Sequence, residues 1–262
     1  MKIKKVIYKK QKKEFIEELN RKVTVQKFEK YFVKNTSNDY NTKFGVIKKE
    51  DLNKEHVVAK CKNQEFSIFT PLTIDQYKNI KRSPQMIPLK DLGNIAAQCG
   101  INRDSIILDS GSGSGGSACY FAQIAKKIYT YDTSQDNVDL TKDNIKDLEL
   151  TNVESNLASI YDDKKIKHKD IDLFILDVPE PWKAIKTAKK TLKVGGFIVN
   201  YSPNITSTQR FVVDIDKKKS FIIEKTVEII EREWEVNEDK VRPKSQQKII
   251  HSGFLTFVRR IN

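Results

Sequence analysis

Glycine and serine alternate in residues 110–116, directly after an apolar run that ends in the carboxylate of Asp109. This pattern predicts a strand, a tight turn and the start of a helix, in which glycines let backbone N–H groups approach a ligand closely. We expect the turn to hold a nucleoside-containing cofactor. Its members are Gly111, Ser112, Gly113, Ser114 and Gly115.

The glycine spacing alone leaves the identity of that cofactor open. Gly111, Gly113 and Gly116 satisfy the pattern G-x-G-x-x-G, so a dinucleotide site has to be considered. Asp132 ends the next predicted strand, where its carboxylate can accept hydrogen bonds from the ribose hydroxyls of NAD or of S-adenosylmethionine. The alternative role for Asp132 is an acid at the N-terminus of the following helix.

The fourth predicted strand of this region favours S-adenosylmethionine. Residues 172–177 end in Asp177 and are followed by V-P-E-P-W, ending at Trp182. Ligands of doubly wound sheets lie at the carboxyl ends of the strands, which predicts that Asp177 lies beside the glycine turn. A proline-restricted acidic turn suits a planar base and has no evident role in hydride transfer. The alternatives are a helix N-cap for Asp177 and ordinary packing for Trp182.

Charge is concentrated at the start of this 262-residue chain, whose formal net charge is +13. The first 80 residues hold 19 Lys and Arg against 10 Asp and Glu, and the rest hold 29 against 25. Such an excess predicts a polyanionic partner, with a solvated lysine-rich surface as the alternative. Three cysteines without metal-ligand spacing predict a reducing, cytoplasmic location and no metal site. No signal peptide or membrane span is expected.

The elements predict two domains, a small, basic and mainly β domain over residues 1–80 and an α/β domain over residues 81–262. Short strands are expected near residues 57–61 and 65–69, and residues 11–20 could form an amphipathic helix. Alternating strands and helices in the second domain predict a Rossmann-like, doubly wound parallel sheet with an antiparallel end. The predicted strands are 105–109, 128–132, 153–159, 172–177, 197–202, 221–235 and 254–260, and the predicted helices include 136–148 and 182–192.

Together these motifs resemble the tRNA (adenine-N1)-methyltransferases that modify adenine 58 of the T-loop, especially the archaeal branch that also modifies adenine 57. Residues 176–182, L-D-V-P-E-P-W, are similar to the family's L-D-x-P-x-P-W. Residues 84–91 resemble its P-Q-x-I…K-D, and residues 44–52 resemble its N-terminal H-x-x-G-x-I-x-H-x-D-L-I. Residues 242–243 and 251–259 look like its terminal R-P…H-T-G-Y-L-x-F-A-R.

The resemblance implies a class I S-adenosylmethionine-dependent methyltransferase that acts on tRNA, usually as a homotetramer. It implies that Asp177 is the catalytic carboxylate, that the glycine turn lines the cofactor's methionine and ribose, and that Asp132 holds the ribose hydroxyls. The full set of implied cofactor contacts is Gln85, Asp109, Gly111, Ser112, Gly113, Ser114, Gly115, Asp132, Asn137, Ser159, Ile160 and Asp177.

The chain departs from the family pattern at three places. Ser159-Ile160 stands where relatives carry an Asp, with Asp162 or Asp163 as substitutes, and Pro88-Leu89 stands where relatives often have Tyr-Pro. The N-terminal histidines are replaced as well, one by Thr42 or Lys43 and the other by Lys49. Two alternative functions stay open at this point: a non-catalytic tRNA-binding scaffold subunit, and a small-molecule methyltransferase of the precorrin type.

Overall fold

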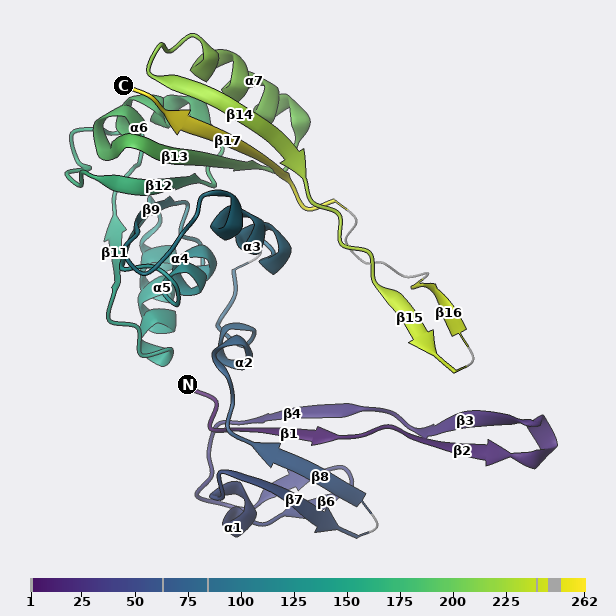
Figure 1. Ribbon diagram of the computed structural model, residues 1–262. Helices are drawn as coiled ribbons and strands as arrows, with labels where there is room; N and C mark the ends of the chain where they lie inside the picture. Colours follow the sequence, from purple (N-terminus) through teal and green to yellow (C-terminus); the bar gives the residue numbers. More distant parts are fainter. Residues whose placement is uncertain (1, 63, 84, 239, 245–250) are drawn as a thin grey trace. The chain divides into compact units, whose positions relative to one another are not determined.

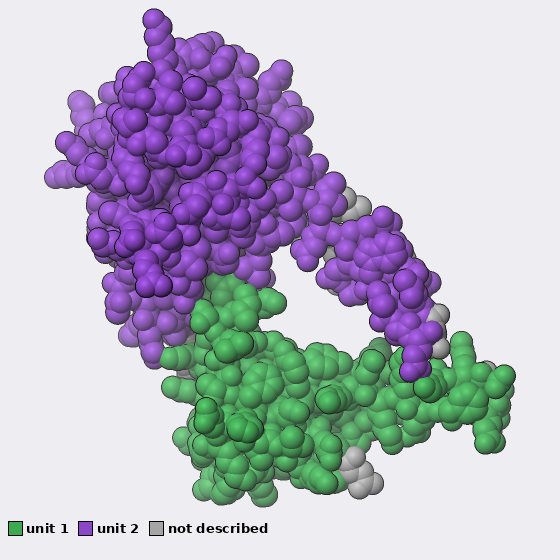
Figure 2. All heavy atoms as spheres, in the orientation of Figure 1, with its two compact units in different colours: residues 1–80 green, residues 81–262 purple. Residues whose placement is uncertain are grey.

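The computed structural model describes residues 2–62, 64–83, 85–238, 240–244 and 251–262. The chain divides into two compact units, residues 1–80 and residues 81–262 (Figure 2). Each unit has its own sheet and its own hydrophobic core, and the elements of both are labelled in Figure 1. Pro84, close to the boundary predicted between the two domains, lies outside the described residues.

Unit 1 is built on a four-stranded antiparallel sheet. Strand β1 (Lys5–Lys9) pairs with β4 (Glu29–Val33) and with β8 (Gln64–Phe69), and β8 also pairs with β7 (His56–Cys61). Side chains alternate between the two faces of a strand, so one face of this sheet is apolar and buried. Its core residues are Ile7, Val33, Ile47, Leu52, Ala59, Phe66 and Ile68.

Residues 11–20 form a strand and a short 3₁₀ turn, so the helix proposed for them is wrong. Strand β2 (Lys12–Ile16) pairs with β3 (Arg21–Gln26) as a hairpin that extends from the sheet in Figure 1. Phe15 is 57% exposed, so an amphipathic helix here would have had little core to pack against. The other elements of unit 1 are η1 (Glu17–Leu19), β5 (Tyr40–Thr42), β6 (Gly45–Ile47), α1 (Lys49–Leu52) and α2 (Thr73–Tyr77).

Unit 2 contains a seven-stranded mixed sheet in the order β11-β10-β9-β12-β13-β17-β14. The first five strands are parallel, and β17 is antiparallel to both of its neighbours, as the sequence predicted. The predicted strand 221–235 is shorter than expected and ends at Glu228. The strands are β9 (Ile106–Ser110), β10 (Lys127–Asp132), β11 (Val153–Leu157), β12 (Ile171–Leu176), β13 (Leu192–Ser202), β14 (Phe221–Glu228) and β17 (Phe254–Arg260).

Helices cover both faces of this sheet (Figure 1). Side chains of the last two helices, such as Ala188 and Phe211, pack in one core cluster with Phe174 and Ile198 of the central strands. The sequence did not reveal the hairpin of β15 (Trp234–Asn237) and β16 (Lys240–Pro243). The helices are α3 (Leu89–Gln98), α4 (Gly116–Phe121), α5 (Gln135–Asp147), η2 (Pro181–Ala184), α6 (Ile185–Thr191) and α7 (Ile205–Asp216).

The strand order creates a topological switch point beside β9. From β9 the chain proceeds to β10 and β11 on one side, and β12 and β13 lie on the other. The loops that follow β9, β10 and β12 therefore leave the sheet at the same edge, where ligands of doubly wound sheets bind. Within the described part of the chain, no helix is both long and apolar enough to cross a membrane.

Candidate active site

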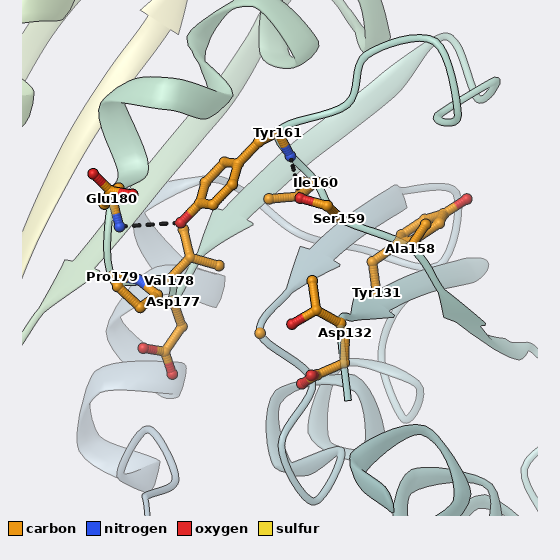
Figure 3. Close-up of a pocket in the computed structure, with 12 residues that line it drawn as sticks. Tyr131, Asp132, Ala158, Ser159, Ile160, Tyr161, Asp177, Val178, Pro179 and Glu180 are labelled. Atoms are coloured by element: carbon orange, nitrogen blue, oxygen red, sulfur yellow. Dashed lines mark hydrogen bonds between the residues drawn. The ribbon is translucent and has the colours of Figure 1, made fainter. Parts of the chain in front are cut away.

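A pocket of about 310 Å³ lies at this edge of the sheet (Figure 3). Its walls come from the ends of β9, β10 and β12 and from the segment that follows β11. The structure thus brings together predicted site residues that are up to 66 positions apart in the sequence. Those that line the pocket are Gly111, Asp132, Ser159, Ile160 and Asp177.

The glycine turn has a backbone that only glycine adopts without strain. Gly111 has a φ of +80° and Gly115 a φ of +77°, both in the left-handed region. A Cβ on Gly111 would stand 1.9 Å from the carbonyl oxygen of Asp177, and a Cβ on Gly115 would stand 2.8 Å from Cγ2 of Thr141. The turn is therefore packed directly against the segment that carries Asp177 on one side and against α5 on the other.

The carboxylate of Asp132 connects the glycine turn to the start of α5. Its Oδ2 accepts hydrogen bonds from the backbone N–H of Gly113 at 3.0 Å, from Nδ2 of Asn137 at 3.2 Å and from the hydroxyl of Ser112 at 3.3 Å. Its Oδ1 accepts from the N–H of Ser134 at 2.9 Å. The same carboxylate thus contacts the start of α5, as expected of an acid at a helix N-terminus, and also the glycine turn.

Asp109 lies below the turn, outside the set of residues that line the pocket. Its buried carboxylate accepts hydrogen bonds from the hydroxyls of Thr130 at 2.5 Å and Ser117 at 3.1 Å. Burial raises the pKa of Asp109 to about 6, and the two hydroxyls partly offset this effect. These hydrogen bonds connect β9 to β10 and to α4. Asp109 therefore stabilises the elements that flank the glycine turn and does not line the pocket itself.

Asp177 directly follows β12 and borders the pocket opposite Asp132 (Figure 3). Its backbone N–H donates to the carbonyl of Ser110 at 3.1 Å, which joins the ends of β12 and β9. Burial, with a smaller contribution from the negative charge of Asp109, raises the pKa of the Asp177 carboxyl to about 7. The N-cap interpretation is wrong, since the 3₁₀ turn η2 begins after Glu180 and has no side-chain cap.

The remaining predicted contacts lie around the glycine turn. The side chain of Gln85 is exposed, while its carbonyl oxygen lies 3.9 Å from the position of a Cβ on Gly113. The hydroxyl of Ser114 is buried and has no hydrogen-bond partner among the described residues. This residue does not line the pocket, and the turn encloses its side chain.

At the third strand, Ser159 lines the pocket, and its hydroxyl accepts a hydrogen bond from the N–H of Tyr161 at 3.3 Å. Neither proposed substitute for the missing carboxylate lines this pocket. Asp163 forms an ion pair with Lys186 at 2.9 Å, and the carboxylate of Asp162 accepts from the N–H of Lys164. The carboxylates that border the pocket from described residues are thus Asp132, Asp177 and Glu180.

Sequence reasoning missed two groups of residues at the site. Tyr161 spans from the third-strand loop to the Asp177 turn, and its hydroxyl accepts from the N–H of Glu180 at 3.1 Å (Figure 3). Thr141 and Asn144 on α5 contact the glycine turn from below, through the carbonyls of Gly113 at 3.3 Å and Ser114 at 2.8 Å. With Asn137 they form an i, i+4, i+7 polar stripe on an inward helix face, a signal that the sequence does carry.

A buried network joins the K-D segment to the C-terminal H-S-G segment. Nζ of Lys90 lies 3.0 Å from the carboxylate of Asp91 and donates to the hydroxyl of Ser252 at 2.6 Å. Ser252 in turn donates to Asp91 at 2.7 Å, and its carbonyl accepts from the hydroxyl of Tyr201 at 2.6 Å. Burial, with smaller contributions from the negative charges of Asp91 and Asp177, raises the pKa of Tyr201 to about 12, so this network lies close to Asp177.

Two further side chains singled out in the sequence have structural roles. Trp182 is absent from the lining of this pocket, and its ring packs against the core under the guanidinium of Arg210, at 3.9 Å from the ring centroid. His251 is hydrogen-bonded to Glu228 at 2.5 Å and to the carbonyl of Pro203 at 2.8 Å. No group of three or more potential metal ligands occurs among the residues that the structure describes.

The fold is that of a class I S-adenosylmethionine-dependent methyltransferase. It superposes on an S-adenosylmethionine-dependent O-methyltransferase from Thermotoga maritima with a TM-score of 0.79 and 21% identity, covering 100% of this chain and 94% of the other. A tRNA (m1A58) methyltransferase TrmI from Aquifex aeolicus gives a TM-score of 0.77 at 20% identity, covering 100% and 98%. These likenesses confirm the predicted fold class.

Sequence comparison identifies the family. Residues 77–253 match the family described as "tRNA methyltransferase complex GCD14 subunit", and the chain belongs to it. A curated relative from Methanocaldococcus jannaschii, the tRNA (adenine(57)-N(1)/adenine(58)-N(1))-methyltransferase TrmI, is 29% identical over 88% of this chain and 91% of its own length. The resemblance to tRNA (adenine-N1)-methyltransferases is thereby confirmed.

Proposed function

We propose that this protein transfers a methyl group from S-adenosylmethionine to N1 of adenine in the T-loop of tRNA, at position 58 or at positions 57 and 58. The observation that carries the proposal is the placement of Asp177. Its carboxylate borders a pocket opposite Asp132 and the glycine turn, and the packing of Gly111 holds its backbone in place.

The residues at the pocket fit the cofactor. We expect Asp132 to accept hydrogen bonds from ribose hydroxyls beside the glycine turn, whose Gly113 N–H it also binds. We propose that Ser159 and Ile160 border the adenine ring of the cofactor, with Gln85 and Asn137 at the periphery of the site. When bound, S-adenosylmethionine supplies a methyl group activated by a sulfonium.

Asp177 is the catalytic residue of this proposal. Methylation of N1 leaves a positive charge that is shared between N1 and the exocyclic amino group of the adenine. A carboxylate that accepts an N6–H hydrogen bond stabilises this charge as it develops, most strongly in a site sheltered from water. Alignment of the two reactants contributes further, and no general base is needed because adenine N1 carries no proton.

The tRNA substrate accounts for the charge of the chain. Adenine 58 has to leave its stack to reach a pocket, and proteins compensate this cost through contacts elsewhere on the nucleic acid. Phosphate contacts from Lys and Arg supply most of the affinity and make it fall steeply with salt. We expect lysines in the basic residues 1–80, such as Lys10, Lys12 and Lys13, to provide part of this surface.

The assembly and location that we propose are a homotetramer in the cytoplasm. The hairpin of β15 and β16 exposes apolar side chains, with Trp234 50%, Val236 70% and Val241 72% exposed, as expected of a surface that another subunit covers. Cys61, Cys99 and Cys119 are free thiols, as expected in a reducing compartment. Light scattering coupled to size-exclusion chromatography tests the assembly.

The reaction is tested by methyl transfer from labelled S-adenosylmethionine to an unmodified tRNA transcript. Wild type and Asp177→Asn are assayed in parallel, and the label is mapped to a nucleotide. A matched transcript with guanine at position 58 shows whether that adenine is the acceptor.

We expect 1-methyladenosine in the T-loop with wild type and a rate lower by about two orders of magnitude or more with Asp177→Asn. Label on no tRNA nucleotide, from a protein that binds S-adenosylmethionine, would overturn the substrate assignment. Turnover of a small molecule without RNA would instead favour the precorrin type.

A further inference from the structure

A second cavity, of about 450 Å³, lies in unit 2 between α6 and the turn that joins α7 to β14. Its lining includes no carboxylate, and Trp182, Ile185 and Phe221 provide its apolar part. Lysines provide most of the rest, and we call this cavity the lysine groove. The six lysines are Lys183, Lys186, Lys189, Lys217, Lys218 and Lys219.

Three of these lysines have carboxylate partners on the rim of the groove. Lys183 pairs with Glu180 at 2.5 Å, Lys186 with Asp163 at 2.9 Å and Lys217 with Asp214 at 3.1 Å. The lysines of these pairs are exposed, so a polyanion can compete with the carboxylates at small cost.

The other three lysines give the groove a net positive charge. Lys189, Lys218 and Lys219 are exposed and form no ion pair with any described residue. The groove therefore holds three excess positive charges beside an apolar surface, a combination that attracts a phosphate-bearing partner and repels a cationic one.

The local fold explains how the lysines converge. Lys183, Lys186 and Lys189 follow one another at a spacing of three, which keeps them on one side of the 3₁₀ turn η2 and of α6. Lys217, Lys218 and Lys219 are consecutive where α7 ends, and the N–H of Phe221 donates to the carbonyl of Lys218 to close this turn. The segments meet because α6 and α7 pack in the same core cluster.

We propose that the lysine groove binds phosphate groups of the tRNA backbone while the T-loop adenine is in the active-site pocket. This inference rests on the proposed function and names a binding surface for its substrate. Trp182 of η2, five residues after Asp177, lines one end of the groove, and the segment that leads into β14 lines the other end, at the sheet edge opposite the active-site pocket. Lysine ammonium groups on flexible stems suit the point charges of phosphates.

The test compares two triple variants with the same change in net charge. The groove variant is Lys189→Gln/Lys218→Gln/Lys219→Gln, and the control is Lys126→Gln/Lys142→Gln/Lys169→Gln, at exposed lysines of unit 2 outside the groove. Equilibrium binding of an unmodified tRNA transcript is measured over a series of salt concentrations. Calorimetric binding of S-adenosylmethionine shows that the pocket is intact in each variant.

We expect the groove variant to bind tRNA about 10-fold or more weakly at low salt, with a salt dependence shallower by roughly two to three ions, and to bind the cofactor normally. The control should retain most of the affinity. The proposal would be overturned if the groove variant had the tRNA affinity and salt dependence of wild type. It would also be overturned if both variants lost tRNA affinity equally. A wild type that binds the cofactor and methylates no tRNA would overturn the proposed function instead, so the two failures are distinguishable.

Discussion

The carbonyl oxygen of Asp177 occupies the space that a Cβ on Gly111 would need, at a distance of 1.9 Å. The glycine turn after β9 and the acidic turn after β12 are thus in direct backbone contact. The N–H of Asp177 also donates to Ser110, one residue before Gly111. Under the proposed function, cofactor binding and catalysis are therefore coupled through the backbone of a single residue, Asp177.

Replacement of Gly111 by alanine should displace the Asp177 turn. Gly100→Ala is a matched control, because Gly100 also has a positive φ, +62°, but has no atom within 4 Å of the position of its Cβ. We expect Gly100→Ala to cost only backbone strain, about 1 kcal/mol, and to leave the reaction intact. Gly111→Ala should lower the methyl-transfer rate by roughly 100-fold, since displacements near 1 Å have effects of this size.

Thermal unfolding and single-turnover rates of the two glycine variants separate strain from displacement. Equal losses of rate in Gly100→Ala and Gly111→Ala would contradict the contact as the cause.

Replacement of Asp132 by alanine should lower both the affinity for S-adenosylmethionine and the stability of the fold. We expect the loss of binding free energy to exceed the loss in the free energy of unfolding. The variant removes the acceptor for the N–H of Gly113 and for the side chain of Asn137. Ser134→Ala is the control, since Ser134 caps α5 and its hydroxyl does not contact the glycine turn. We expect Ser134→Ala to cost about 1 kcal/mol of stability with normal cofactor affinity.

Isothermal titration with S-adenosylmethionine distinguishes the two roles of Asp132. If Asp132→Ala behaves as Ser134→Ala does, with lower stability and unchanged cofactor affinity, its role is confined to the helix start.

The rate of methyl transfer should depend on the ionisation of Asp177. Burial and the charge of Asp109 raise the pKa of its carboxyl to about 7, and the ionised form is the one that stabilises positive charge on the adenine. We therefore expect kcat/KM to rise with pH through a midpoint near pH 7, since this ratio reports on the free enzyme. Asp177→Asn should lose this rise, and a wild-type profile that is flat from pH 5.5 to 8.5 would contradict the assignment.

The same raised pKa makes a prediction about stability. In the unfolded chain this carboxyl has an ordinary pKa of about 4, so the folded state binds more protons than the unfolded state from about pH 4 to pH 7. The free energy of unfolding contributed by Asp177 therefore falls as pH rises through this window. Asp177→Asn should be more stable than wild type at pH 8 and lose this advantage near pH 4, as measured by thermal unfolding.

Removal of one partner from the buried network around Asp91 should be costly. Lys90→Met would leave the fully buried carboxylate of Asp91 without its cation, and we expect a loss of roughly 3–5 kcal/mol. Lys81→Met breaks the exposed pair with Asp143 and should cost no more than about 1 kcal/mol. Urea unfolding measures both, and the double change Lys90→Met/Asp91→Leu should recover part of the loss.

The sequence by itself determined the parts of the site that depend on local pattern. An apolar run that ends in Asp109 and breaks into glycines specifies a strand and a turn, because a backbone with positive φ strongly favours glycine. Asp132 and Asp177 were also located from local pattern, because each is a polar residue at the end of a predicted buried strand. Alternation of strands and helices then implied a parallel sheet whose strand ends converge.

Only the tertiary structure decided which distant residues meet. Asp91 and Ser252 are 161 positions apart, and the lysine groove joins two segments whose proximity depends on how α6 and α7 pack. The hairpin at residues 12–26 also required tertiary information, because a strand partner decides between helix and strand where the local preference is weak. Contacts of this kind follow from strand order and packing, which no local pattern of residues specifies.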